Sequence, residues 1–174
     1  MCICPKLPNS EPIESVMPPS SPPIPSRSDC SATTLRKASR KVAQLFDEAL
    51  APCGLRSTQY SILVEIARHE GNPPTLQVLA DALVMDRSTL GHNLRPLERD
   101  GLVAIVPGVA DRRRRHIELT SAGRRKLRAA HELWLKAQTF FHEVYGEVAA
   151  AQLRTTLLDI AYDDRLDFLT AARH

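Results

Sequence analysis

The sequence has no apolar run long enough to cross a membrane and no histidine or cysteine spacing typical of a metal site. Its seven glycines do not gather into a phosphate-binding loop. There is no nucleophile elbow and no pair of carboxylates in an apolar setting, and the six histidines are scattered. These absences argue against an enzyme, a bound cofactor or metal ion, and a membrane protein.

Cysteine is scarce too, with four residues at positions 2, 4, 30 and 53. The start of the chain lacks the basic residues of a signal peptide, so we expect a reducing, cytoplasmic location. Residues 1–28 hold eight of the thirteen prolines, with serines between them and no net charge. Because this composition cannot bury a core, we expect a disordered leader followed by one folded domain over residues 29–174.

The folded part shows mainly helical periodicity. Apolar residues recur every three to four positions in four stretches besides the central one described next. These predict helices from Ser31 or Thr33 to about 50, from Ser57 or Thr58 to 69, from 121 to about 145 and from 148 to 170. A loop is expected over 70–74.

Residues 75–100 show two short helical patterns joined by a turn of about three residues. Asp86 stands where the N-cap of the second helix is expected, because its carboxylate can accept from the amide of Ser88 or Thr89. Pro96 should bend this helix and Gly101 should end it, giving a range of 86 to about 100. Its core face carries Leu90, Leu94 and Leu97. The pattern is that of a helix-turn-helix.

Two strand-like runs follow, over 102–107 and 115–120, and they flank an arginine cluster. This arrangement predicts a β-hairpin wing with a long basic tip. From 107 to 128 the chain carries eight positive and two negative residues, so the segment is +6 while the whole chain is only +3. Such a local excess is typical of a surface that binds nucleic-acid phosphates. The predicted fold class is mainly α with a small β-hairpin, a winged helix-turn-helix core.

The outward positions of the second helix are short or polar, which indicates contact rather than mere solvation. Base-edge candidates are Ser88, Thr89, His92 and Asn93, with Arg87 directed at guanine or a phosphate. Arg95 and Arg99 lie later on the helix and are expected to contact phosphates. In the hairpin, Arg113 is the minor-groove candidate, and Arg112, Arg114 and Arg115 are expected to clamp phosphates.

The segment DRSTLGHNLRPLERDGLV, followed by DRRRRHIELTSAGR, resembles the MarR family of winged helix-turn-helix regulators. The upstream LRKASRKVAQLFDEALAPCGLRSTQYSILVEIA resembles the first two helices of that family. The resemblance covers about residues 30–172. It implies a homodimer that binds pseudopalindromic duplex DNA and is released by a small molecule or by oxidation. It also implies that Asp111 orients the hairpin while Arg113 enters the minor groove.

The helices outside the central stretch carry more apolar surface than a chain of this size can cover alone. We therefore expect a symmetric dimer, with residues 30–52 and 121–172 forming the dimerisation helices around a winged helix at 55–120. A small phenolic or aromatic ligand would act between the two parts. The residues proposed to line its pocket are Ser39, Arg40, Tyr60, His131 and Trp134.

Two other interpretations stay open. Cys30 precedes the first helix, where a helix N-terminus can lower a thiol pKa, so the regulator could sense oxidation instead of a ligand. A winged helix can also serve as a protein-docking module, which requires a neutral or apolar recognition face. The polar face and the basic wing favour DNA, and the main prediction is a ligand-released repressor.

Overall fold

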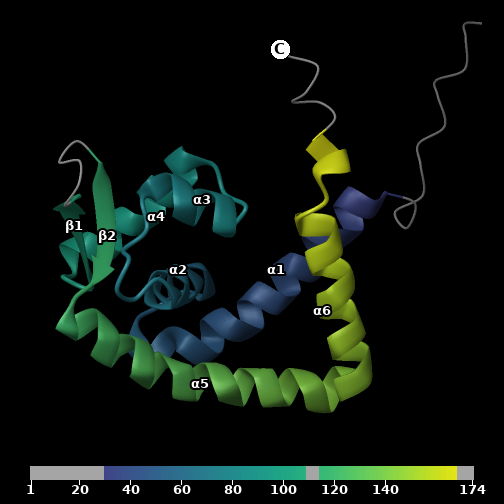
Figure 1. Cartoon of the computed structure of the whole chain (residues 1–174). Coiled ribbons are helices and arrows are strands. Elements are labelled where there is room, and N and C mark those ends of the chain that lie inside the picture. The colour runs from purple at the N-terminus through teal and green to yellow at the C-terminus, as the bar shows by residue number, and fades with distance from the viewer. Residues whose placement is uncertain (1–29, 109–113, 168–174) are drawn as a thin grey trace, which may run out of the picture. The chain divides into compact units, whose positions relative to one another are not determined.

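The computed structural model describes residues 30–108 and 114–167, and the chain divides by its internal contacts into residues 1–37 and 38–174. The helices are α1 Ser31–Leu50, η1 Ala51–Cys53, α2 Ser57–Arg68, α3 Leu76–Ala82, α4 Arg87–Arg99, α5 Ser121–Tyr145, α6 Glu147–Ala161 and η2 Asp164–Asp167, and the strands are β1 Val103–Pro107 and β2 Arg115–Leu119 (Figure 1). The predicted mainly helical fold with one small hairpin is confirmed. The expected leader lies outside the described residues.

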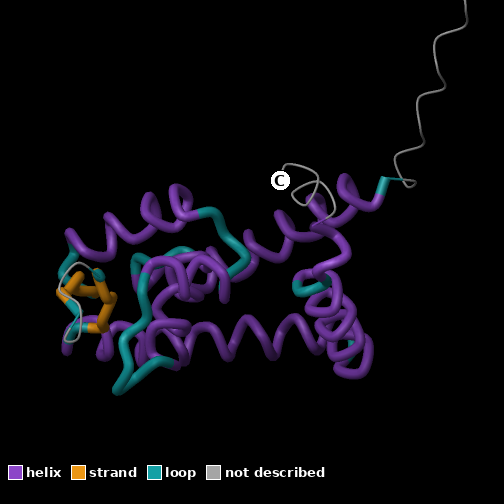
Figure 2. The backbone as a smooth tube through the Cα atoms, turned by 45° about the horizontal axis from the view of Figure 1, so that its top comes forward, coloured by secondary structure: helices purple, strands orange, loops and turns teal. Residues whose placement is uncertain are grey.

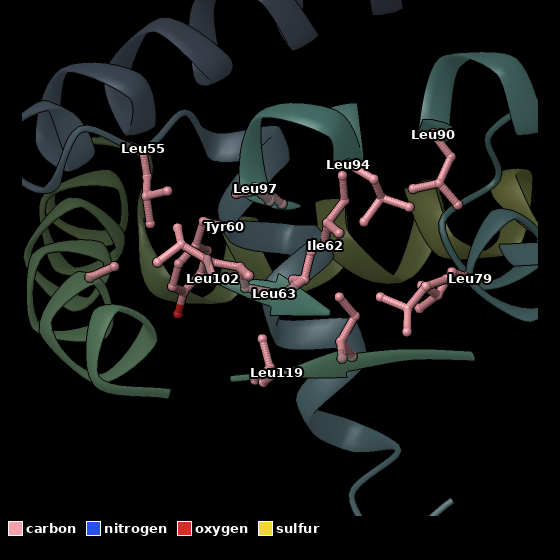
Figure 3. Close-up of a cluster of buried hydrophobic side chains, with 14 of the residues drawn as sticks. Leu55, Tyr60, Ile62, Leu63, Leu79, Leu90, Leu94, Leu97, Leu102 and Leu119 are labelled. Carbon is pink, nitrogen blue, oxygen red and sulfur yellow. The ribbon is translucent and has the colours of Figure 1, made fainter. Parts of the chain in front are cut away.

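Helix α2 lies at the centre of the core, since it contacts α3, α4, α5 and β2. Ile62 and Leu63 of α2 are fully buried among leucines from the surrounding elements (Figure 3). Its first turn is fixed to α1, because the backbone amide and the hydroxyl of Ser57 both donate to Asp47 Oδ1, at 2.7 and 2.6 Å. The helix-turn-helix is therefore built on a rigid support.

Helix α4 runs through Pro96 and ends at Arg99, as the sequence predicts. Gly101 follows with a φ of 67°, a left-handed conformation that glycine adopts without strain. The amide of Gly101 donates to the carbonyl of Glu98, and the amide of Leu102 donates to that of Leu97, at 2.9 and 2.8 Å. This is a Schellman motif, and it turns the chain directly into β1.

Strands β1 and β2 pair antiparallel, with Ile105 opposite Ile117 and Pro107 opposite Arg115. The expected loop at 70–74 does more than connect two helices. The amide of Ile117 donates to the carbonyl of Pro74 at 2.9 Å, and Thr75 forms a bridge with His116. The wing is thus paired along a second edge and leads straight into α5 (Figure 2). Local sequence gave no sign of this pairing.

The end of the last helix was predicted wrongly. The sequence suggested a helix to Thr170, but α6 ends at Ala161, and η2 follows after a break. The Asp163 carboxylate accepts from the backbone amide of Arg165 at 3.0 Å, which starts a new turn. The hydroxyl of Tyr162 meanwhile donates to the carbonyl of Ala82 at 2.9 Å, so the end of α6 contacts the end of α3.

Candidate nucleic-acid interface and adjoining cleft

The first turn of α4 is organised by the carboxylate of Asp86. This carboxylate accepts from the backbone amide of Thr89 at 2.8 Å, from the Thr89 hydroxyl at 2.6 Å and from the Ser88 hydroxyl at 2.5 Å. The hydrogen bonds, first those from the two side chains, hold the pKa of Asp86 far below its usual range. The predicted cap is present: Thr89 donates its backbone amide, one of the two amides expected to do so, and Ser88 donates through its hydroxyl.

The outward face of α4 is polar because the helix buries its leucines. Leu90, Leu94 and Leu97 are at most 3% exposed, which directs the other positions away from the core. The predicted contact residues that lie exposed on this helix are Arg87, Ser88, Thr89, His92, Arg95 and Arg99, and Asn93 is half-buried. The structure therefore brings all seven of these candidates to one element.

Besides Ser88 and Thr89, three more of these side chains have protein partners. The guanidinium of Arg87 donates to the side-chain oxygen of Gln77 on α3. The amide nitrogen of Asn93 donates to the carbonyl of Thr89 at 2.9 Å, and Arg99 pairs with Asp100 at 3.0 Å. The Arg99 pair is exposed at both ends, so it leaves much of that charge accessible to a polyanion.

The basic wing is described only in part. Arg114 and Arg115 are exposed where β2 begins, and the amide of Gly108 donates to the carbonyl of Arg114 at 2.8 Å across the base of the loop. Asp111, Arg112 and Arg113 lie outside the described residues. Their assigned roles therefore stay predictions.

A tight junction joins the wing to α5. The hydroxyl of Thr120 donates to the carbonyl of Gly101 at 2.6 Å and accepts from the amide of Gly123 at 3.0 Å. The amide of Thr120 donates to the carbonyl of Leu102 at 3.1 Å. A Cβ at Gly123 would overlap that same Leu102 carbonyl oxygen, so only glycine allows this approach. Neither the role of Thr120 nor that of Gly123 was predicted from the sequence.

A cleft of about 1000 Å³ adjoins the helix-turn-helix. Its walls come from α2, α5, the end of α6 and the turn between α3 and α4. The Tyr60 hydroxyl and His131 Nδ1 share a hydrogen bond of 2.9 Å. The Trp134 ring stacks on both rings, with centroids 5.6 Å from His131 and 6.0 Å from Tyr60. Burial raises the pKa of the Tyr60 phenol above its ordinary value.

Three of the five predicted pocket residues thus line one cleft, although Tyr60 and His131 are 71 positions apart. Ser39 and Arg40 do not line it. Both residues lie in the first half of α1, where every side chain is exposed. The one buried residue of α1 is Leu50, at the other end of the helix. Val84 and Tyr162 also belong to the cleft wall, and neither was predicted from the sequence.

Cys30 lies directly before α1 and is half-buried. The hydroxyl of Thr33 lies 3.2 Å from its sulfur, and this hydrogen bond is the main cause that lowers the pKa of the Cys30 thiol. Over residues 30–108 and 114–167 there is no cluster of histidine, cysteine and acidic side chains that could hold a metal ion. Within those same ranges no helix is long and apolar enough to span a membrane.

Taken together, a helix-turn-helix with a polar second helix and a paired β-hairpin after it defines a winged helix-turn-helix protein. The sequence model of the MarR family matches residues 54–114. The structure is similar to that of the M. tuberculosis transcriptional regulator MosR, with 34% identity and a TM-score of 0.67 over 78% of this chain and 97% of that one. The chain belongs to the MarR family.

Two further proteins are similar to this chain. CouR from Rhodococcus jostii RHA1, solved with p-coumaroyl-CoA, is 29% identical with a TM-score of 0.66, over 78% of this chain and 94% of that one. The transcriptional activatory protein BadR of Rhodopseudomonas palustris is 34% identical over 96 residues, which are 55% of this chain and 51% of BadR. The chain thus spans about half the length of that curated relative. MosR and CouR have both also been solved with DNA.

Proposed function

We propose that this protein is a transcription regulator that binds a specific duplex DNA sequence as a homodimer in the cytoplasm. The observation that carries the proposal is the polar outer face of α4, held rigid by Asp86 and flanked by the basic wing. Its family membership and the DNA complexes of MosR and CouR support the same function. A regulator of this kind needs no catalytic group, and we propose no enzymatic activity.

A gel-shift with duplex DNA from upstream of the protein's own gene tests this proposal. Binding at about 50 mM salt that weakens by orders of magnitude near 200 mM is expected, because several phosphates are contacted. A complete lack of binding at the lower salt, with this DNA and with a random duplex library, would reject DNA binding. Retention of a protein partner instead would favour the docking-module alternative.

The homodimer is supported by apolar surface that the single chain leaves open. Near the α5–α6 corner and along α6, eight large apolar side chains are at least 39% exposed: Phe140, Val144, Tyr145, Val148, Leu157, Leu158, Ile160 and Tyr162. Large apolar side chains left exposed in this number are typical of a contact between subunits. A twofold axis there would present two copies of α4, which must lie about 34 Å apart to enter successive major grooves.

A small aromatic or phenolic ligand is the proposed signal. The cleft is lined by the stacked aromatic rings of Trp134 and His131, and the Tyr60 hydroxyl can bind a polar group of the ligand. Arg128 lies on the same wall and could pair with a carboxylate. The complex of CouR with p-coumaroyl-CoA supports a ligand of this chemistry, and acids or thioesters of this type are the first to test.

The position of the cleft beside the helix-turn-helix supports an influence on DNA binding. Val84 lies in the turn between α3 and α4 with a φ of 50°, a conformation that costs a β-branched residue about 1–3 kcal/mol. The same turn forms part of the cleft wall, and the Tyr162 hydroxyl of α6 is bonded to Ala82 at its start. We propose that an occupied cleft shifts this turn, and α5 with it, so that the spacing of the two α4 helices no longer fits DNA.

Replacing Tyr60 with Phe should weaken ligand binding about fivefold, since one hydrogen bond is lost, while DNA affinity stays within about twofold. Trp134 is the only tryptophan of the chain and lines the cleft, so its fluorescence reports ligand binding directly. The control is Tyr145→Phe, because Tyr145 lies outside the lining and stacks on Phe141. Equal losses in both variants would contradict the assigned site.

Replacing Arg113 with Ala should weaken DNA binding and lower the slope of log affinity against log salt by about one. The expected cause is the loss of one cationic contact in the minor groove. Affinities measured at four salt concentrations give the slope. Arg165→Ala is the control, because Arg165 pairs with Asp163 next to α6. An unchanged affinity at every salt concentration would remove Arg113 from the interface.

The redox alternative rests on the lowered pKa of Cys30. If oxidation is the signal, peroxide should release DNA from the protein and Cys30→Ser should abolish that release. If the cleft is the signal site, the Ser variant should respond to ligand as the native protein does. Whether the regulator represses stays a prediction, because CouR is a transcriptional repressor and BadR a transcriptional activatory protein.

A further inference from the structure

The hydroxyl groups of Ser88 and Thr89 have a fixed hydrogen-bond direction. Both lie within hydrogen-bond distance of Asp86, Ser88 Oγ at 2.5 Å from Oδ1 and Thr89 Oγ1 at 2.6 Å from Oδ2. An ionised carboxylate has no hydrogen to give, so each hydroxyl must donate to it. The hydrogens of both hydroxyls are therefore directed back into the first turn of α4, and only oxygen lone pairs remain to face outward.

This direction should persist on DNA. Turning a hydroxyl away from Asp86 would break a charge-assisted hydrogen bond, which is roughly twice as strong as a neutral one. It would also leave the carboxylate less compensated in the strong negative field of the phosphates. The third donor, the backbone amide of Thr89, is bonded at 2.8 Å and cannot replace the two hydroxyls, because it is already used.

An acceptor facing the major groove can bind only a donor on a base edge. The donors there are the N6 amino group of adenine and the N4 amino group of cytosine, whereas N7, O6 and O4 are acceptors. Phosphate oxygens are acceptors as well. We propose that Ser88 and Thr89 act as acceptors that select an exocyclic amino group, on adenine or cytosine, in each half-site. This inference rests on the proposed function, in which α4 enters the major groove.

Arg87, next to them, has the opposite polarity. Gln77 donates from Nε2 to Asp81 at 2.5 Å and accepts from Arg87 through its side-chain oxygen, so the orientation of the Gln77 amide is set. Gln77 is thus a positioning residue that fixes where the Arg87 guanidinium is held. The first turn of α4 therefore offers donors at Arg87 and acceptors at Ser88 and Thr89, a pattern that can distinguish base pairs.

The test begins with a duplex selected by the purified full chain from a random library of about 30 base pairs, enough for two half-sites. In that duplex, each half-site adenine is replaced by 2-aminopurine, which moves the amino group out of the major groove, and each cytosine by 2-pyrimidinone, which lacks it. We expect one or two positions per half-site where affinity falls about fivefold, the loss of one hydrogen bond. 7-Deazapurines, which remove the N7 acceptor instead, are the control.

The variants then assign the effect to the hydroxyls. With Ser88→Ala or Thr89→Val, the native duplex should bind about fivefold more weakly, and removing the critical amino group should cost nothing further. Asp86→Asn keeps a good helix cap, but the asparagine NH2 group donates where a carboxylate oxygen accepted. One of the two hydroxyls must then accept from this NH2 group, so its hydrogen is free to face the DNA. The requirement for a base amino group at that position should therefore weaken. Thr156→Val, whose hydroxyl bonds to Gln152 of its own helix, is the control.

DNA binding by the protein and the acceptor role of Ser88 and Thr89 are contradicted by different results. If the library yields no bound duplex, the DNA-binding function itself is wrong. If a duplex is selected but loss of every major-groove amino group is harmless, the acceptor assignment is wrong and the regulator remains. The assignment is also overturned if the Ser88 and Thr89 variants keep their full sensitivity to amino removal, because some other residue then contacts that group.

Discussion

Gly123→Ala should destabilise the folded protein by about 3 kcal/mol, at the upper end of the usual cost of overpacking. A Cβ at position 123 would overlap the Leu102 carbonyl oxygen and lie 3.0 Å from its carbonyl carbon. That oxygen accepts from Thr120 and belongs to the backbone between α4 and β1, so it cannot move as a flexible side chain could. The wing and the start of α5 would have to separate.

Denaturant unfolding followed by circular dichroism measures this loss. Gly91→Ala is a matched control, because Gly91 also lies in a helix but has nothing within 4 Å of an added Cβ. Alanine there should stabilise the protein by up to about 1 kcal/mol, since it is the better helix former. If Gly123→Ala is as stable as the native protein, the described junction between wing and α5 is incorrect.

Leu157→Lys should raise the dimer dissociation constant by about a hundredfold or more. Leu157 lies on α6 in the apolar surface that we assign to the subunit interface and is 39% exposed in the single chain. In a homodimer each subunit contributes one substituted residue, so two unpaired charges would be desolvated. Binding to a duplex with two half-sites should fall in parallel, because a monomer can contact only one of them.

Analytical ultracentrifugation over a concentration series measures the dissociation constant. Thr155→Lys adds the same charge at an exposed polar residue of α6, whose hydroxyl bonds to Ala151 of its own helix. That control should dimerise and bind DNA as the native protein does. Should both lysine variants remain dimeric, the subunits meet elsewhere and the role of α6 must be revised.

The limits of α4 could be predicted from local features of the sequence. Asp86 as cap, the leucine spacing and Gly101 as terminator together set the limits of α4, and the structure confirms them. The helix was expected to continue through Pro96, and it does so. These features depend only on neighbours within a few residues, which is why they could be predicted.

What the sequence missed depends on distant contacts. The pairing of the 73–75 segment with β2 joins residues more than forty positions apart, and the two prolines there suggested only a loop. The early end of α6 coincides with a hydrogen bond from Tyr162 to Ala82, 80 positions earlier in the chain. The left-handed conformation of Val84 could not be predicted locally, because a turn of this kind often contains glycine at such a position and valine stands there instead. The cleft likewise forms only when α2 and α5 pack.

The stoichiometry of the complex on DNA tests the central claim most directly. Sedimentation of the full chain with its selected duplex at low salt should give two chains per duplex. Footprinting should show two protected major-groove segments about one helical turn, or 34 Å, apart. One chain per duplex, or no complex even at low ionic strength, would contradict the proposal that paired α4 helices recognise DNA.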